Sequence, residues 1–226
     1  MRAAAPRASL LLVAASAALA IASFTGLLPA SWAFLFKPLT TLLIIAHAWP
    51  RGTGLQRRLI LTGLVLSLAG DVFLLWPQQG FLPGLVSFLL AHLAYIGAFC
   101  VPVRLAASPR VFIAYGVIAA LILWQLWPGI PAPLRAPGVA YVVCLAAMAT
   151  QAGAWWRQRA GTGSADEPLA RLAATGGVLF MASDSLLATN KFAVELPLSS
   201  LWILATYWAA QWLIASSLPG SRQPRA

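Results

Sequence analysis

The sequence has 226 residues, of which 61% are hydrophobic and 9% are charged, and its formal net charge is +10 at pH 7. In soluble domains about a quarter of the residues are charged, so this composition excludes that class and indicates a polytopic membrane protein. The positive charge does not predict a nucleic-acid partner, because the basic residues stand at the borders of hydrophobic runs rather than on one polar face.

Eight runs of mostly apolar residues are each long enough to cross a hydrocarbon core of about 30 Å as a helix. They lie at 8–28, 31–49, 59–77, 81–101, 111–127, 137–156, 169–190 and 198–218. The connections are short, and no internal repeat or separate soluble domain is visible. The sequence therefore predicts an all-α protein, with one membrane domain of eight transmembrane helices over residues 1–226.

Most of the basic residues fall on one side of this alternating arrangement of helices. They are Arg2, Arg7, Arg51, Arg57, Arg58, Arg104, Arg110, Arg157, Arg159, Arg171, Arg222 and Arg225, whereas Lys37, Arg135 and Lys191 fall on the other side. The positive-inside rule then predicts that both termini are cytoplasmic. All-helical spans suit a bacterial inner (plasma) membrane.

The first run also has features of a signal peptide, because arginines precede its apolar stretch and an Ala-Leu-Ala precedes Ile21. Cleavage there would leave the other seven helices in the same orientation. The charge pattern therefore leaves both outcomes open.

Two carboxylates, Asp71 and Asp184, stand inside apolar runs. A charge in a bilayer costs at least a few kcal/mol, so such residues are functional candidates. Counting helical rise from the outer ends places both carboxylates, and Lys37, at a common depth of about 9 Å. Small residues precede each aspartate and predict that the two helices pack directly on each other: Gly63, Ser67, Ala173 and Gly177.

One lysine cation can balance only one of these two carboxylates, so Asp71 and Asp184 are expected to supply one acid and one base for catalysis. The alternative is a structural role, with both held by Lys37 and nearby hydroxyls of Ser67, Ser183 and Ser185. A metal site is not expected, because the chain has only two histidines, at different depths. Signatures of serine hydrolases, zinc proteases and P-loop proteins are absent from the sequence.

Other polar side chains are candidates for substrate binding in a cavity that opens outward. They are Lys37, His92, Tyr95, Ser183, Asn190, Lys191, Tyr207 and Gln211. Asn190 and Lys191 stand at the interface, where an anionic lipid headgroup would lie. Alternatives remain open, because a lysine near a helix end also reaches the interface by snorkelling, and His92 on an aromatic face also suits packing.

Five short motifs occur in order along the chain. They are Lys37-Pro-Leu-Thr-Thr41, Gly70-Asp71-Val-Phe-Leu-Leu75, Phe88-Leu-Leu-Ala-His92-Leu-Ala-Tyr95, Ser183-Asp184-Ser185-Leu with Asn190-Lys191-Phe192, and Tyr207-Trp-Ala-Ala-Gln211. This ordered set resembles the YhhN-like lysoplasmalogenase family. No motif in the runs 111–127 and 137–156 contributes to the resemblance.

The resemblance implies an integral membrane protein of eight helices that keeps its first helix. It also implies hydrolysis of the vinyl ether bond of lysoplasmalogens, which gives a fatty aldehyde and a glycerophospho-ethanolamine or -choline. Protonation of the vinyl ether carbon gives an oxocarbenium ion that water attacks, as in glycoside hydrolysis by two carboxylates. An acid and a base suffice for this reaction, so no cofactor is expected.

Three other functions fit two aspartates in a membrane. An intramembrane aspartyl protease is disfavoured, because Leu68 breaks its Gly-x-Gly-Asp motif. A proton-coupled transporter of small molecules or lipids also uses buried acids, although such proteins commonly have inverted repeats. A non-catalytic lipid-binding protein is the third alternative.

Overall fold

The computed structural model describes residues 4–76 and 78–220. Its α-helices are α1 (Ala4–Phe24), α2 (Ala33–Ala48), α3 (Gly54–Phe73), α4 (Phe81–Cys100), α5 (Pro109–Leu126), α6 (Ala132–Arg159), α7 (Glu167–Phe192) and α8 (Ser199–Ser216), with short 3-10 helices η1 (Ala30–Trp32) and η2 (Trp127–Gly129). The described ranges contain no β-strand. Arg2, Pro77, Arg222 and Arg225, which entered the sequence predictions, lie outside the described residues.

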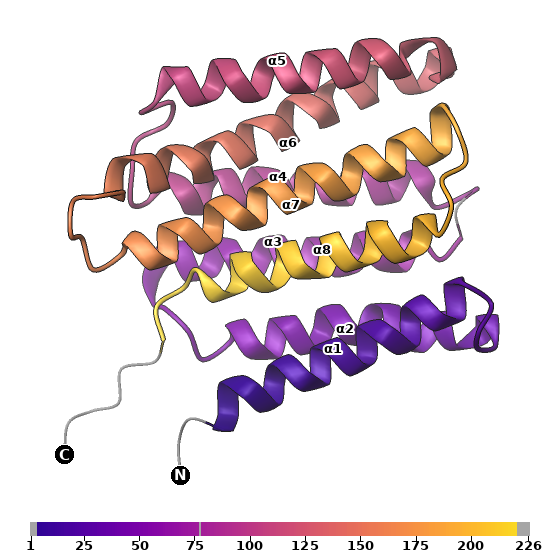
Figure 1. Cartoon of the computed structure of the whole chain (residues 1–226), viewed down its shortest axis with the longest axis horizontal. Helices are drawn as coiled ribbons and strands as arrows, with labels where there is room; N and C mark the ends of the chain where they lie inside the picture. The colour runs from indigo at the N-terminus through magenta and orange to yellow at the C-terminus, as the bar shows by residue number, and fades with distance from the viewer. Residues whose placement is uncertain (1–3, 77, 221–226) are drawn as a thin grey trace.

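The helices form an antiparallel bundle in which consecutive helices lie side by side, except that α5 follows α4 in the chain but packs mainly on α6 (Figure 1). The pair α7 and α8 lies in front of α4 and α3, with α1 and α2 along one side of these four and α5 and α6 along the other. The start of α1 and the end of α8 lie at the same end of the bundle. The predicted all-α bundle of eight helices is therefore confirmed.

Six of these helices are long and apolar enough to cross a membrane by length and composition, namely α1, α2 with η1, α4, α5, α6 and α7. The helices α3 and α8 are not among them. The reason is polar content, since α3 carries Arg57, Arg58 and Asp71, and α8 carries Tyr207 and Gln211. Nothing in the fold assigns an end of the bundle to a side of the membrane, so the cytoplasmic termini stay a prediction.

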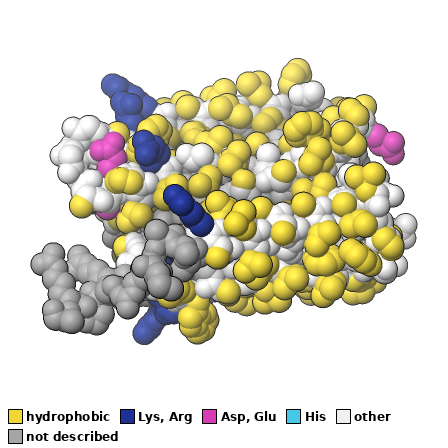
Figure 2. All heavy atoms as spheres, turned by 60° about the horizontal axis from the view of Figure 1, so that its bottom comes forward, with side chains coloured by type: hydrophobic (Ala, Val, Ile, Leu, Met, Phe, Trp, Pro, Cys, Tyr) yellow, Lys and Arg dark blue, Asp and Glu magenta, His cyan; other side chains and the backbone are white. Residues whose placement is uncertain are grey.

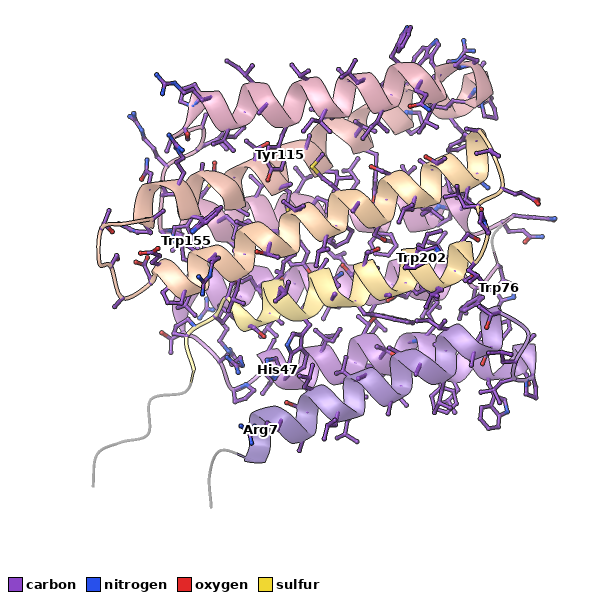
Figure 3. All side chains as sticks on the ribbon, viewed as in Figure 1. Arg7, His47, Trp76, Tyr115, Trp155 and Trp202 are labelled. Atoms are coloured by element: carbon purple, nitrogen blue, oxygen red, sulfur yellow. The ribbon has the colours of Figure 1, made fainter. Side chains whose placement is uncertain are left out.

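The surface of the bundle is strongly apolar. Figure 2 shows hydrophobic side chains over most of one face, with Lys and Arg gathered near the end that holds the start of α1 and the end of α8. Arg7, His47 and Trp155 lie toward that end, whereas Trp76 and Trp202 lie toward the opposite end (Figure 3). An apolar belt with tryptophans near its border is typical of a chain embedded in a bilayer.

Close helix contacts occur at glycines, but between other helices than the sequence predicted. A Cβ atom on Gly63 would lie 2.3 Å from the Tyr95 ring of α4, and one on Gly177 would lie 2.9 Å from Cα of Ala149 in α6. The helix α8 packs on both α3 and α7, which make no comparable contact with each other within the described chain. The predicted direct packing of these two helices is therefore wrong, because the glycines admit an aromatic ring on α4 and the backbone of α6.

Two helix ends differ from the sequence prediction in ways that affect the site. The helix α3 ends at Phe73 rather than at 77, and the Gly80 N–H donates a hydrogen bond to the Trp76 carbonyl oxygen at 2.7 Å. A Cβ atom on Gly80 would lie 1.8 Å from the carbonyl oxygen of Phe73, so this close approach needs glycine. The helix α6 begins at Ala132 rather than at 137, because Pro133 stands in its first turn, where a missing N–H costs no helical hydrogen bond.

The turn between α6 and α7 is fixed by Asp166. Its Oδ2 accepts hydrogen bonds from Arg159 Nε at 3.1 Å and from Trp155 Nε1 at 3.3 Å, and its Oδ1 accepts one from Ser164. Partial burial alone would raise the pKa of Asp166, but the hydrogen bonds from Ser164 and Trp155 and the charge of Arg159 hold this pKa below its usual value. The long helix α7, which carries Asp184, thus starts from an anchored position.

Candidate active site

Asp71, near the end of α3, is buried with 1% of its surface exposed. Its Oδ2 accepts hydrogen bonds from Thr41 Oγ1 at 2.6 Å and from the Tyr207 hydroxyl at 2.8 Å. Lys37 Nζ lies 4.0 Å from the other oxygen, Oδ1. Two hydroxyl donors and one cation all favour the ionised form of this carboxyl group.

A chain of hydrogen bonds holds Tyr207 in place. The Tyr95 hydroxyl of α4 donates to Gln211 Oε1 at 2.6 Å, and Gln211 Nε2 donates to the Tyr207 hydroxyl at 3.3 Å. Tyr207 then donates to Asp71. Tyr95 and Gln211 therefore act on Asp71 through Tyr207 rather than by facing a ligand.

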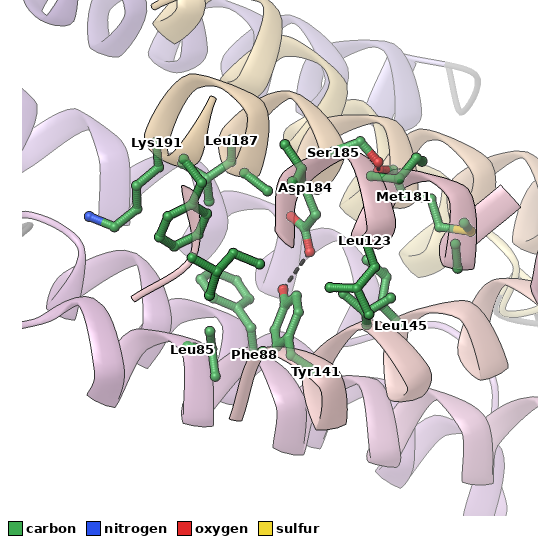
Figure 4. A pocket seen from close by; sticks show the side chains of 18 of the residues that line it. Leu85, Phe88, Leu123, Tyr141, Leu145, Met181, Asp184, Ser185, Leu187 and Lys191 are labelled. Carbon is green, nitrogen blue, oxygen red and sulfur yellow. Dashed lines mark hydrogen bonds between the residues drawn. The ribbon is translucent and has the colours of Figure 1, made fainter. Parts of the chain in front are cut away.

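Asp184, on α7, has different surroundings from Asp71. Tyr141 of α6 donates a hydrogen bond to Asp184 Oδ2 (Figure 4). No ion pair to Asp184 is present among the described residues. One neutral phenol donor offsets only part of the cost of an ionised carboxylate in an apolar wall. Without a cation nearby, the protonated form of Asp184 is therefore favoured.

The side chains of both aspartates line one cavity of about 440 Å³. Seven of the predicted site residues line it: Lys37, Asp71, Ser183, Asp184, Asn190, Lys191 and Tyr207. The counted depths placed the two carboxylates equally far from their helix ends, whereas Asp71 lies close to the end of α3 and Asp184 lies further inside α7. The structure brings them to one cavity nonetheless.

His92, Tyr95 and Gln211 are not among the residues that line this cavity. His92 is fully buried, with its ring against Phe180 at 4.7 Å and Tyr141 at 5.2 Å between centroids. Neither of its ring nitrogens has a hydrogen-bond partner in the described part of the chain. His92 therefore packs behind the cavity wall, against the tyrosine that holds Asp184.

The serines do not hold Asp184 in the way that the structural alternative supposed. Ser183 Oγ donates to the Ile203 carbonyl oxygen at 2.9 Å, and Ser185 Oγ donates to that of Met181 at 2.7 Å. Both hydroxyls thus satisfy backbone groups.

Asn190 and Lys191 lie at the end of α7, beside the cavity. Asn190 Oδ1 accepts a hydrogen bond from the Leu196 N–H at 2.9 Å, which closes the loop to α8. Lys191 Nζ lies 4.1 Å from the centroid of the Phe81 ring. The Lys191 ammonium forms no ion pair within the described ranges, so its charge is available to a ligand.

Tyr141 and Thr41 are the contacts of the two carboxylates that sequence reasoning did not assign. Thr41 belongs to the Lys37–Thr41 motif, but the motif alone gave it no function. Tyr141 lies in the run 137–156, which carries no motif. A tyrosine in an apolar helix usually finds a partner for its hydroxyl group, but no pattern in the sequence identifies Asp184 as that partner.

No group of three or more His, Cys, Asp or Glu side chains suited to a metal occurs in residues 4–76 and 78–220. Catalysis without a metal or an organic cofactor stays a prediction.

Comparison with known proteins decides the family. The family model described as the YhhN family matches residues 32–218. The chain belongs to the YhhN family. This match includes every α-helix except α1, so the resemblance predicted from the motifs is confirmed.

Several named relatives of this YhhN family member are about one-third identical to it. Lysoplasmalogenase TMEM86B of Homo sapiens is 34% identical over 198 residues, which cover 86% of this chain and 79% of the relative. Lysoplasmalogenase TMEM86A of Bos taurus is 35% identical over 170 residues, covering 73% and 67%. Lysoplasmalogenase of Mycobacterium bovis is 34% identical over 193 residues, covering 80% and 68%. No solved structure matches the chain.

Proposed function

We propose that this YhhN family member is a lysoplasmalogenase, a membrane hydrolase that cleaves the vinyl ether bond of lysoplasmalogens. The products are a fatty aldehyde and glycerophospho-ethanolamine or -choline. The observation that carries the proposal is one cavity lined by both Asp71 and Asp184, in a chain whose relatives are named lysoplasmalogenases. The lysophospholipid substrate would come from the bilayer that surrounds the protein.

Asp71 is the base in this proposal. The Lys37 ammonium lies 4.0 Å from its Oδ1, and Thr41 and Tyr207 donate to its Oδ2. These groups stabilise a carboxylate, which can accept a proton from water. Tyr95 and Gln211 position Tyr207 for this task.

Asp184 is the acid. Tyr141 is a neutral donor, and within the described chain no basic group forms an ion pair with Asp184. A carboxyl group in such a low-dielectric wall is favoured in its neutral form. It then holds a proton that it can donate to a vinyl ether carbon.

The reaction balances with these two groups alone. Asp184 donates its proton to the vinyl carbon distal to the ether oxygen, which gives an oxocarbenium ion. Asp71 removes a proton from water as the water oxygen bonds to the other vinyl carbon, and a hemiacetal results. The C–O bond to glycerol then breaks, with the hemiacetal proton returning to Asp184 and the proton on Asp71 passing to the glycerol oxygen.

Lys191 is the proposed contact for the substrate phosphate, with Asn190 and Ser183 beside it. All three line the cavity, and Lys191 brings a cation that is not paired with a carboxylate among the described residues. The cavity also contains Lys37, but the charge of Lys37 is directed to Asp71. An ammonium is a common ligand of phosphate groups.

We also propose a location in a bacterial inner (plasma) membrane, with both termini in the cytoplasm. The supporting observation is that basic residues gather near the end of the bundle where α1 starts and α8 ends (Figure 2).

The test offers purified protein a lysoplasmalogen, the matching acyl lysophospholipid and the matching saturated ether, and follows aldehyde and fatty acid release separately. Only the vinyl ether should turn over. An ester needs a nucleophile and an oxyanion hole, and a saturated ether cannot be protonated at carbon to give an oxocarbenium ion. Fatty acid release equal to aldehyde release would refute the proposal.

A further inference from the structure

A second, mostly apolar cavity of about 110 Å³ lies among α4, α5, α6 and α7 (Figure 4). Its walls include Leu85 of α4, Leu123 of α5, Leu145 of α6 and Met181 of α7. Its ionisable lining groups are Tyr141, Asp184 and Lys191. The rest of its wall is suited to a hydrocarbon chain.

This apolar cavity and the larger polar cavity share one wall. The residues common to both are Leu74, Phe81, Phe88, Tyr141, Asp184, Leu187 and Lys191. Asp71, Lys37 and Tyr207 line only the polar cavity, whereas the residues of α5 line only the apolar one. Asp184 therefore stands at the junction between a polar chamber and an apolar chamber.

A lysoplasmalogen has the same division, because its vinyl ether bond joins a polar glycerophospho group to a hydrocarbon chain. We infer that the apolar cavity holds the part of the substrate's alkenyl chain that directly follows the double bond and that α5 is the wall that determines chain specificity. The inference rests on the proposed function for the identity of the ligand. The vinyl carbons would then lie beside Asp184 while the headgroup occupies the polar cavity.

The helix α5 is otherwise poorly buried. Its two buried residues, Ala119 and Leu126, both line the apolar cavity. By contrast, Leu121 and Trp124 are 58% and 78% exposed. The buried face of α5 thus serves mainly to close this cavity.

The alkenyl chain of the substrate gains no hydrophobic energy by leaving the bilayer for this cavity, since lipid tails are as apolar as leucine. The benefit is positional, because a chain held in a shaped cavity keeps its double bond next to the acid. Blocking the cavity should therefore lower turnover of substrates whose chain must enter it and spare those whose chain is short.

The first experiment compares Ala119→Phe with Ala120→Phe. Ala119 is 8% exposed and lines the cavity, while its neighbour Ala120 is exposed and does not line it. For a lysoplasmalogen with a hexadecenyl chain, Ala119→Phe should lower kcat/KM by about tenfold or more, because a displaced chain moves the double bond away from the acid, and a misplacement of about 1 Å can cost about 10²-fold. With a butenyl chain kcat/KM should stay unchanged, and Ala120→Phe should affect neither substrate. Equal loss for both chain lengths, or no loss for either, would refute the inference.

The second experiment needs no variant and no turnover. A saturated ether lysophospholipid with a photoreactive diazirine in its chain is irradiated with the wild-type protein in lipid nanodiscs. The label should appear on Leu123 and Val142, which line the cavity, and the unlabelled saturated ether, which is not turned over, should compete with it. Uncompeted labelling confined to the lipid-facing Leu121 and Trp124 would refute the inference.

The two proposals can fail separately. Competed labelling in the cavity without aldehyde release would refute the proposed hydrolysis and support the chain site. Aldehyde release with labelling only on the exposed residues would support the proposed hydrolysis and refute the chain site.

Discussion

At the residue scale, Asp71 and Asp184 line one cavity with different partners. Asp71 has a cation and two hydroxyl donors, whereas Asp184 has a tyrosine donor and forms no ion pair among the described residues. General acid–base catalysis needs this kind of inequality between two carboxyl groups. Counting charges in the sequence predicts that Lys37 balances one of the two aspartates. That this aspartate is Asp71, and which aspartate is the acid, require the partners that the fold supplies.

The first prediction concerns the carboxyl groups themselves. Asp71→Asn and Asp184→Asn should each lower kcat by about 10²–10⁴-fold, the usual contribution of a general acid or base. Glu195→Gln, at an exposed carboxylate that lines neither cavity, should keep full turnover and serves as the control. Aldehyde release by purified variants of equal size-exclusion profile is the measurement, and full activity of both site variants would contradict the mechanism.

The second prediction isolates Tyr141 as a positioning residue. Tyr141→Phe removes the donor to Asp184 but keeps the ring that packs on His92. We expect kcat to fall by about tenfold or more with KM nearly unchanged, because the lost hydrogen bond orients the acid rather than the lipid. Tyr115→Phe, on α5 outside both cavities, should change neither constant. A rise in KM at constant kcat would instead make Tyr141 a binding residue.

At the element scale, α8 connects the two halves of the site. It carries Tyr207 to Asp71, carries Gln211 to Tyr95 of α4, and packs on α7, which bears Asp184. The sequence predicted the helices but not this connection. Small residues indicate that another helix can approach closely, but they do not identify which helix it is. Gly63 shows this, since it admits the Tyr95 ring and not the helix that bears Asp184.

The third prediction uses Gly63 to disturb that connection. A Cβ atom there would lie 2.3 Å from the Tyr95 ring, so Gly63→Ala must displace Tyr95 and loosen its hydrogen bond to Gln211. Both the unfolding temperature and kcat should fall. Gly116→Ala, which meets nothing within 4 Å, should leave both unchanged. If Gly63→Ala keeps the wild-type kcat, the hydrogen bonds from Tyr95 through Gln211 to Tyr207 do not contribute to catalysis.

At the scale of the whole molecule, the eight helices and their alternation follow from hydropathy and charge. The count could be predicted because each apolar run is long enough and is bordered by basic or turn-forming residues. Tyr141 could not be assigned in the same way, because its role depends on how α6 packs against α7 rather than on its neighbours in the sequence.

The fourth prediction concerns orientation. In a background with Cys100→Ala and Cys144→Ala, a cysteine at Glu195 should react with an impermeant thiol reagent in intact cells. A cysteine at Ser164, in the turn between α6 and α7, should react only after the cells are opened. The reason is the gathering of arginines at the end of the bundle where that turn lies. The opposite labelling pattern would place both termini outside.

The fifth prediction tests the central claim, which is proton transfer from an aspartate to carbon. Purified protein is given a lysoplasmalogen in deuterium oxide, and the aldehyde is analysed by mass spectrometry and NMR. The mechanism predicts one deuterium on the carbon next to the aldehyde carbonyl, a slower reaction than in ordinary water, and aldehyde release by Asp184→Asn that is about 10²–10⁴-fold slower. Aldehyde that forms rapidly without deuterium at that carbon would contradict the two-aspartate mechanism.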